Sequence, residues 1–229
     1  MNKKVLTALI SISMISALTM TSFGAETEAD EDYLSSISGE YVELFPELSK
    51  EEYHEKWLSA VTPATGEEAA EDTVSMLLGS CMGEIYGEEA VKTYESAPET
   101  AVFDCYFLGG VKKFVIDGDQ ITGLDENGEE VFSHTYKRMD QTSEFEQTYY
   151  ESSDPDSGEF TYFVFLPDTP DTTYHLEFRY GEDLEGMDQW TEGQYAYWNA
   201  AAIPADYDEE LMTNCIDLFA SENLSGDEE

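Results

Sequence analysis

"KKFVIDGDQITGLDENGEEVFSHTYKRMD", residues 112–140, is the stretch that decides the class of the fold. Apolar and polar residues alternate on either side of two short turn sequences, Asp117-Gly118 and Asn127-Gly128. Alternation with a period of two is typical of half-buried strands, and Asp-Gly or Asn-Gly between such runs is a strong hairpin signal. The stretch therefore predicts three antiparallel strands joined by two tight turns.

The same pattern continues toward the C-terminus. A further hairpin is predicted to turn at "SSDPDSGE" (152–159), and "TTYHLEFRYG" (172–181) predicts the next strand. Helices are predicted on both sides of these strands, at 49–61, 66–83 and 206–219, and Ser49 with Glu52 is a capping-box signature for the first of them. Consecutive antiparallel strands flanked by short helices favour a mainly β fold, either a barrel or a strongly curved sheet.

The N-terminus has the pattern of a signal peptide. A basic "MNKK" is followed by the apolar run "VLTALISISMISALTM" and then by small residues that end at Ala25. The run is shorter than the roughly 20 residues that span a bilayer, so we expect cleavage near residue 25 and a secreted or periplasmic protein without a membrane anchor. We expect an acidic flexible leader at 26–37, the folded domain at 38–223 and an acidic tail at 224–229.

The charge balance excludes some classes of function. The chain has 51 acidic and 10 basic residues and a formal net charge of −41, so its surface repels nucleic acid and anionic membranes. Its aromatic content of 13% argues against a disordered acidic chain. It contains no phosphate-binding loop and no nucleophile motif, and we therefore expect a monomeric binding protein and no enzymatic activity.

The sequence does not determine how the three cysteines are used. Cys81, Cys105 and Cys215 are far apart in the sequence, and none belongs to a CxxC pair. Outside the cytoplasm one disulfide would be possible, with one thiol left over and the pairing undetermined. A metal site made of cysteines is not expected.

One strand carries the residues from which a binding site could be built. The run "YHLEFRY" (174–180) alternates an apolar face with a polar face that holds His175, Glu177 and Arg179. An imidazole and a carboxylate two residues apart on a strand can both reach one cation. Alternatively, His175 is structural and Glu177 pairs with Arg179.

Four short motifs, in order, resemble the ZinT (YodA) family of extracytoplasmic zinc-binding proteins. "GEYVELFPEL" (39–48) resembles the family's G-x-W-x-S-V-x-P-Y-L, with Tyr41 in place of Trp and Glu47 in place of Tyr. "DPDS" (154–157) resembles the DPxS turn, "HLEFRYG" (175–181) resembles H-F-H-I-x-M-G, and "MDQW" (187–190) resembles M-D-N-W. The resemblance covers residues 38–223 and is poorest over 49–105. It implies a calycin (lipocalin-like) antiparallel β-barrel.

The resemblance also implies a metal site. The three metal-binding histidines of the family correspond to Asp168, His175 and Glu177, so two of the three are replaced by carboxylates. Carboxylates still bind zinc, although the harder donor set also suits Mn²⁺ or Ca²⁺. The implied function is zinc buffering, or delivery of metal to the substrate-binding protein of a metal ABC transporter.

Two other functions are open at this point. In the first, the metal site is lost, and the barrel binds a small organic ligand or a protein partner. Its pocket would be formed by the aromatic cluster of Trp190, Tyr195, Tyr197 and Trp198, which could equally be core packing. In the second, a metal-dependent enzyme uses the open coordination position that three protein ligands leave.

Overall fold

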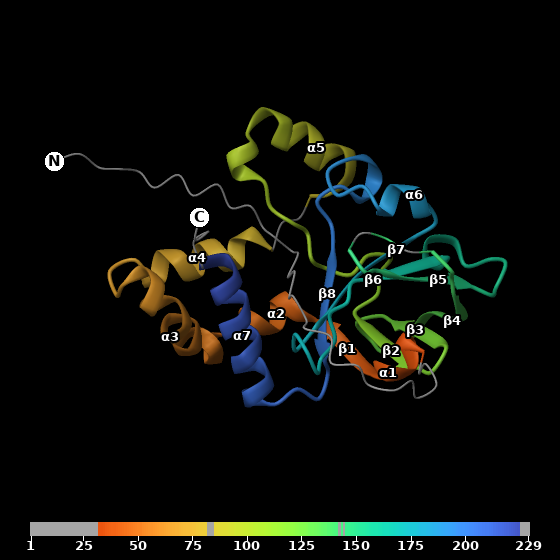
Figure 1. The fold of residues 1–229 in the computed structure, drawn as a ribbon, viewed down its shortest axis with the longest axis horizontal. Coiled ribbons are helices and arrows are strands. Elements are labelled where there is room, and N and C mark those ends of the chain that lie inside the picture. The colour runs from red at the N-terminus through yellow and green to blue at the C-terminus, as the bar shows by residue number, and fades with distance from the viewer. Residues whose placement is uncertain (1–31, 82–84, 142, 144, 225–229) are drawn as a thin grey trace, which may run out of the picture.

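The chain folds into a closed barrel of eight antiparallel strands with helices packed beside it (Figure 1). The computed structural model describes residues 32–81, 85–141, 143 and 145–224. The strands follow one another around the barrel in sequence order, and β1 closes it by pairing with β8. Their bounds are β1 Gly39–Glu43, β2 Lys113–Asp117, β3 Gln120–Leu124, β4 Glu130–Arg138, β5 Thr148–Ser152, β6 Tyr162–Phe165, β7 Leu176–Gly181 and β8 Ala200–Pro204. The predicted calycin-like barrel is confirmed.

Short helices complete the fold. Their bounds are α1 Tyr33–Ser36, α2 Leu44–Leu48, α3 His54–Thr65, α4 Ala70–Ser80, α5 Gly87–Ser96, α6 Leu184–Met187 and α7 Glu209–Leu224, with 3₁₀ turns η1 Glu51–Tyr53, η2 Pro98–Thr100, η3 Gly158–Phe160 and η4 Gly193–Tyr195. In Figure 1, α3, α4 and α7 lie together on the side of the barrel formed by β8 and β1. Over the described ranges, no helix is both long enough and apolar enough to cross a membrane. The expected signal peptide at 1–25 lies outside these ranges, as do residues 26–31 and 225–229.

The predicted turns and helices form, but the helices have other bounds: 66–83 corresponds to α4 and 206–219 to α7, and residues 82–83 lie outside the described ranges. Gly118 and Gly128 both adopt positive φ in the turns that join β2 to β3 and β3 to β4. The predicted helix at 49–61 is present, but it begins at His54 after a 3₁₀ turn. The capping box predicted for it does not form, because Ser49 ends α2 and so is not available to begin α3.

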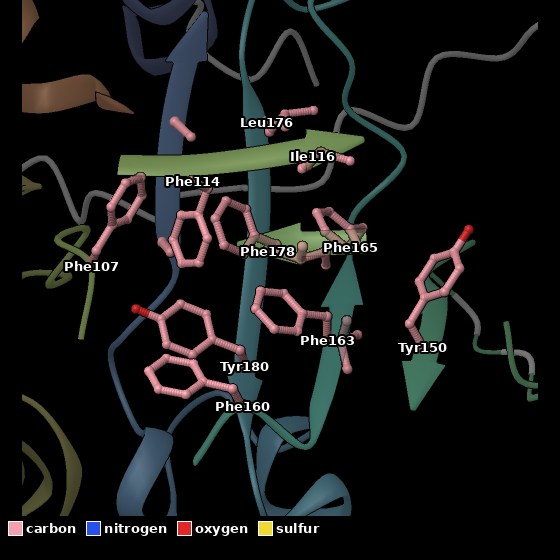
Figure 2. Packing of buried hydrophobic residues seen from close by; sticks show 14 of the residues in the cluster. Phe107, Phe114, Ile116, Tyr150, Phe160, Phe163, Phe165, Leu176, Phe178 and Tyr180 are labelled. Atoms are coloured by element: carbon pink, nitrogen blue, oxygen red, sulfur yellow. The ribbon is translucent and has the colours of Figure 1, made fainter. Parts of the chain in front are cut away.

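The inside of the barrel is filled by aromatic side chains (Figure 2). Phe114 lies 5.4 Å from Phe178, and Phe163 lies 5.1 Å from Tyr180, measured between ring centroids. Such contacts bury large apolar areas and favour tilted or offset rings. The space between these rings is too small to admit a water molecule. This interior is therefore a packed core and offers no cup for an organic ligand.

The prediction of a flexible leader at 26–37 is partly wrong. Residues 33–36, predicted to belong to it, form α1, and Leu34 and Ile37 are buried in the barrel core. The backbone N–H of Leu34 donates to the hydroxyl of Tyr150 at 3.1 Å. The folded domain thus begins at or before Tyr33, because two apolar side chains within an acidic stretch close one part of the core.

A second core lies between the outer wall of the barrel and the helical layer. Ala201 and Ile203 of β8 point away from the barrel interior and pack in the same cluster as Met212, Cys215 and Ile216 of α7. Because neighbouring residues of a strand face opposite sides of the sheet, each wall strand here contributes to both cores. The helices therefore enclose the outer surface of β8 and of the residues paired with it.

Two glycine substitutions test the packing of the first core. A Cβ on Gly123 would overlap the ring of Phe132 and lie 2.9 Å from Val111, and both neighbours are buried. Gly123→Ala is expected to destabilise the protein by about 1–3 kcal/mol through overpacking. The control is Gly79→Ala on the exposed side of α4, where nothing lies within 4 Å of the new methyl group. It should stabilise the protein by up to about 1 kcal/mol. Urea unfolding measures both, and equal effects would contradict the packing described.

Candidate metal centre

The site residues predicted from the sequence gather at the connection between β6 and β7. Asp168 follows β6, His175 directly precedes β7, and Glu177 is the second residue of β7. His175 is therefore outside the strand in which it was expected. The reason is Tyr174, whose φ of 68° turns the chain immediately before the strand begins.

Glu177 faces the outside of the barrel. Its neighbours Leu176 and Phe178 point into the aromatic core, whereas Glu177 lies opposite Ala201 of β8, which packs against the helical layer. The predicted site residues lie at one end of β6 and β7. Glu177 is on the outer surface of the wall and beneath α7, because the interior is already filled.

His175 and Glu177 are held side by side in a largely buried position. The Nε2 atom of His175 lies 3.4 Å from Oε1 of Glu177, and their side chains are 13% and 16% exposed. The Nδ1 atom of His175 lies 2.6 Å from the carbonyl oxygen of Thr173, which can only accept, so Nδ1 carries a proton. The side-chain amide of Asn199 donates to Oε2 of Glu177 at 3.0 Å. Each side chain thus has one atom fixed by a neighbour and turns the other toward its partner.

Neighbouring groups shift the protonation of His175. Burial by itself lowers the pKa of this imidazole, but contact with the Cys215 thiol and with the Glu177 carboxylate outweighs burial and raises the pKa well above its ordinary value. Without a metal, a protonated His175 therefore pairs with Glu177. A cation bound by both side chains would take the place of the Nε2 proton.

Asp168 lies within electrostatic reach of this pair. Burial and the charge of Glu177 raise the pKa of Asp168 to about 6, although His175 and a hydrogen bond with Thr173 act in the opposite direction. The backbone carbonyl of Asp168 accepts a hydrogen bond from the hydroxyl of Tyr33 at 2.8 Å. In the part of the chain that the structure describes, no three His, Cys, Asp or Glu side chains already stand as a metal-ligand set. The structure therefore brings His175 and Glu177 together and leaves Asp168 beside them.

Sequence analysis missed the thiols that border the site. Cys215 on α7 contacts His175. Cys105 contacts Cys81, and the negative charge of Glu177 contributes to raising the pKa of Cys105. All three cysteines are at most 2% exposed. Because they come from distant parts of the chain, no motif could have joined them. The one available signal was that Cys215 lies within the helix predicted at 206–219.

Arg179 does not pair with Glu177, contrary to one of the alternatives. Its guanidinium is buried, stacks on the ring of Trp190 at 3.8 Å, and donates to the carbonyl oxygens of Met187 and Gln189. Burial lowers the pKa of Arg179 to about 9. The partners of Glu177 are instead His175 and Asn199, so its carboxylate is not neutralised by a permanent cation in the strand.

The aromatic cluster noted in the sequence offers little room for an organic ligand. Tyr195 and Trp198, from the aromatic cluster noted in the sequence, are buried in the barrel core. An open groove of about 730 Å³ lies at one end of the barrel and contains none of Asp168, His175 and Glu177. Its lining residues are Ser36, Ser38, Gly39, Glu40, Tyr41, Lys113, Thr169, Pro170, Asp171, Pro204, Ala205 and Asp206. An organic ligand would therefore have to occupy this groove and not the aromatic cluster.

Comparison with solved structures supports the fold. The chain is similar to the crystal structure of the Zn(II)-bound ZinT-like domain of AdcA from Streptococcus pneumoniae, with a TM-score of 0.50, 14% sequence identity, and coverage of 84% of this chain and 94% of that one. A structure of Zn(II)-bound AdcA from the same organism gives a TM-score of 0.47 at 13% identity and covers 84% of this chain and 39% of that one. No family profile and no curated protein sequence matches the chain. At this identity the likeness shows a shared fold, and it does not by itself make the chain a member of the ZinT family.

Replacing Asp168 tests whether the site is strained when no metal is bound. The pKa of Asp168 is about 6 in the folded protein, against about 3.9 for an unfolded chain, so the folded state holds the proton more tightly. Ionisation therefore destabilises the folded state. The penalty is nearly absent at about pH 4 and reaches about 3 kcal/mol above pH 6. In chelator at pH 7.5, Asp168→Asn should accordingly be more stable than the unsubstituted protein by up to about 3 kcal/mol, and this difference should nearly vanish at pH 4.

Urea unfolding at the two pH values measures this difference. The control is Asp171→Asn, which changes an exposed carboxylate in the same loop and should have little effect. An Asp168→Asn protein that is less stable than the unsubstituted protein at pH 7.5 would mean that Asp168 is a structural residue.

Proposed function

We propose that this chain is an extracytoplasmic divalent-metal-binding protein that holds zinc through Asp168, His175 and Glu177. The observation that carries the proposal is the arrangement of His175 and Glu177. Their facing atoms are 3.4 Å apart, and the outer atom of each side chain is held by Thr173 or Asn199. By resemblance to ZinT proteins, its role is to buffer metal or to pass it to the substrate-binding protein of a metal ABC transporter.

The spacing fits two donors of one ion. Zn–N distances of about 2.0–2.1 Å and Zn–O distances of about 2.0–2.2 Å, at a tetrahedral angle, place the two donor atoms roughly 3.3–3.4 Å apart. The 3.4 Å between Nε2 and Oε1 agrees with this value and is longer than a usual hydrogen bond. Metal-binding histidines commonly donate their second N–H to a carbonyl or a carboxylate, as His175 does to Thr173.

The charges favour a divalent cation. Two carboxylates, Asp168 and Glu177, are within electrostatic reach of each other. Burial, and after it the charge of Glu177, raises the pKa of Asp168. A divalent ion would neutralise both. One imidazole and two carboxylates form a harder donor set than three imidazoles, so zinc should bind less tightly than at a three-histidine site and Mn²⁺ or Ca²⁺ should compete better.

Two further arguments bear on the choice of function. The solved structures similar in fold are described as Zn(II)-bound, which supports zinc as the first metal to test. Three protein ligands leave one coordination position open, which suits an ion that must be released, but no general base has been identified beside it. We therefore retain a binding role and not an enzymatic one.

Zinc calorimetry on the purified protein tests the proposal. In buffer with enough salt to screen the acidic surface, we expect one site of micromolar affinity or tighter that is lost in His175→Ala. The matched control is His54→Ala, which removes an exposed histidine that is paired with Glu71. Weak binding at many sites, equal in all three proteins, would mean that zinc only collects around a highly charged surface.

The two carboxylates should differ in importance. Oε1 of Glu177 already faces Nε2 of His175 on a paired strand, whereas Asp168 belongs to the connecting loop. Glu177→Gln should therefore weaken zinc binding by about 100-fold and Asp168→Asn by about tenfold, with about 1.4 kcal/mol for each factor of ten. Glu182→Gln, a change at an exposed position after β7, should have no effect in the same titration. The reverse order for the first two variants would contradict the proposed geometry.

A further inference from the structure

A pair of buried thiols lies next to the site and takes no part in the proposed metal binding. Cys81 follows α4 directly, and Cys105 lies in the segment that precedes β2. The backbone N–H of Phe103 donates to the carbonyl oxygen of Ser80 at 2.9 Å, which holds these two segments side by side. The thiols of Cys81 and Cys105 contact each other within the second core and are 0% and 2% exposed.

We propose that Cys81 and Cys105 form an intramolecular disulfide in this protein and that Cys215 remains a free thiol. Three cysteines allow three pairings, and the structure brings only the thiols of Cys81 and Cys105 together. Cys215 instead contacts the imidazole of His175 from α7. A disulfide needs Cβ atoms about 3.5–4.5 Å apart. All three cysteines are free thiols in the structure, so the bond requires the side chains of Cys81 and Cys105 to turn toward each other from their present contact.

The oxidation needs an acceptor, and a disulfide compound of the kind found outside the cytoplasm provides one. One cysteine thiolate attacks the acceptor disulfide, forms a mixed disulfide and releases one acceptor thiolate. The second cysteine then attacks the mixed disulfide at the protein sulfur, which closes the Cys81–Cys105 bond and releases the second acceptor thiolate. In total the protein loses two protons and two electrons, and the acceptor disulfide becomes two thiols. Because both cysteines are buried after folding, the bond forms while the chain folds.

The bond would join the helical layer to the barrel wall. Cys105 accepts a hydrogen bond from the backbone N–H of Ala201 through its carbonyl oxygen, at 3.2 Å, and Ala201 is the β8 residue opposite Glu177. Cys81 is at the end of α4, which packs against α3 in the helical layer. A Cys81–Cys105 bond therefore fastens this layer to the wall that carries the candidate metal centre. Neither cysteine is a proposed zinc ligand, so the disulfide and the metal site can fail independently.

Counting thiols tests the pairing. The reduced, denatured full chain is refolded with oxidised and reduced glutathione, denatured again without reductant, and labelled with N-ethylmaleimide for intact-mass analysis. We expect one label per chain, and three labels when reductant is added before labelling. Peptide mapping should find residues 81 and 105 linked. Three labels without reductant, a bridge that includes Cys215, or a covalent dimer would overturn the proposal.

Single variants distinguish the pairings. Cys215→Ser should keep the bridge and take no label before reduction, whereas Cys81→Ser and Cys105→Ser should each take two. Reduction should lower the melting temperature of the unsubstituted protein and of Cys215→Ser by about 5–10 °C, because the bond restricts the unfolded chain. Reduction should leave the melting temperature of Cys81→Ser unchanged. Two free thiols in Cys215→Ser before reduction would contradict the proposed pair.

Discussion

The packing of aromatic rings inside the barrel is the constraint on which the other features depend. Each strand turns alternate side chains inward, and in β7 these are Leu176, Phe178 and Tyr180. Once the interior is filled with rings, a carboxylate placed there would lose its hydrogen bonds to water. The residues between them must face outward, so Glu177 can act only on the outer wall of the barrel. In a lipocalin-like fold a ligand cup would lie inside the barrel. In this protein the candidate site lies outside it.

The helical layer shields this part of the outer wall from water. The cluster around Met212, Cys215 and Ile216 covers the wall beside Glu177 and leaves its side chain 16% exposed. In such a setting, like charges repel more strongly than they would in water. Burial, and after it the charge of Glu177, raises the pKa of Asp168. A cation in the proposed site would relieve the cost of keeping these two carboxylates ionised beside the imidazole.

Local patterns predicted the antiparallel strands well, because period-two alternation and the turns at Gly118 and Gly128 depend on neighbouring residues only. The choice of a closed barrel came from the resemblance to ZinT proteins. The features that were missed depend on contacts across the chain. The positive φ of Tyr174 moves His175 out of its expected strand, and the burial of Leu34 in the barrel gives structure to part of the expected leader. For the site, the sequence predicted that His175 and Glu177 lie together. It could not predict the bordering thiols, since only the packing of helices on the wall brings them there.

The way each candidate ligand is held suggests how binding and release could be combined. Glu177 lies in a strand that is paired on both sides, with β6 and β8, and its carboxylate is oriented by Asn199. The imidazole of His175 is oriented by the carbonyl of Thr173. Asp168 lies in the loop between β6 and β7, and its carboxyl does not complete a ligand set. If the proposed site binds metal, a fixed pair of donors with a third donor on a loop would let it close on an ion and open again. That property suits a protein that buffers or transfers metal better than one that keeps its metal permanently.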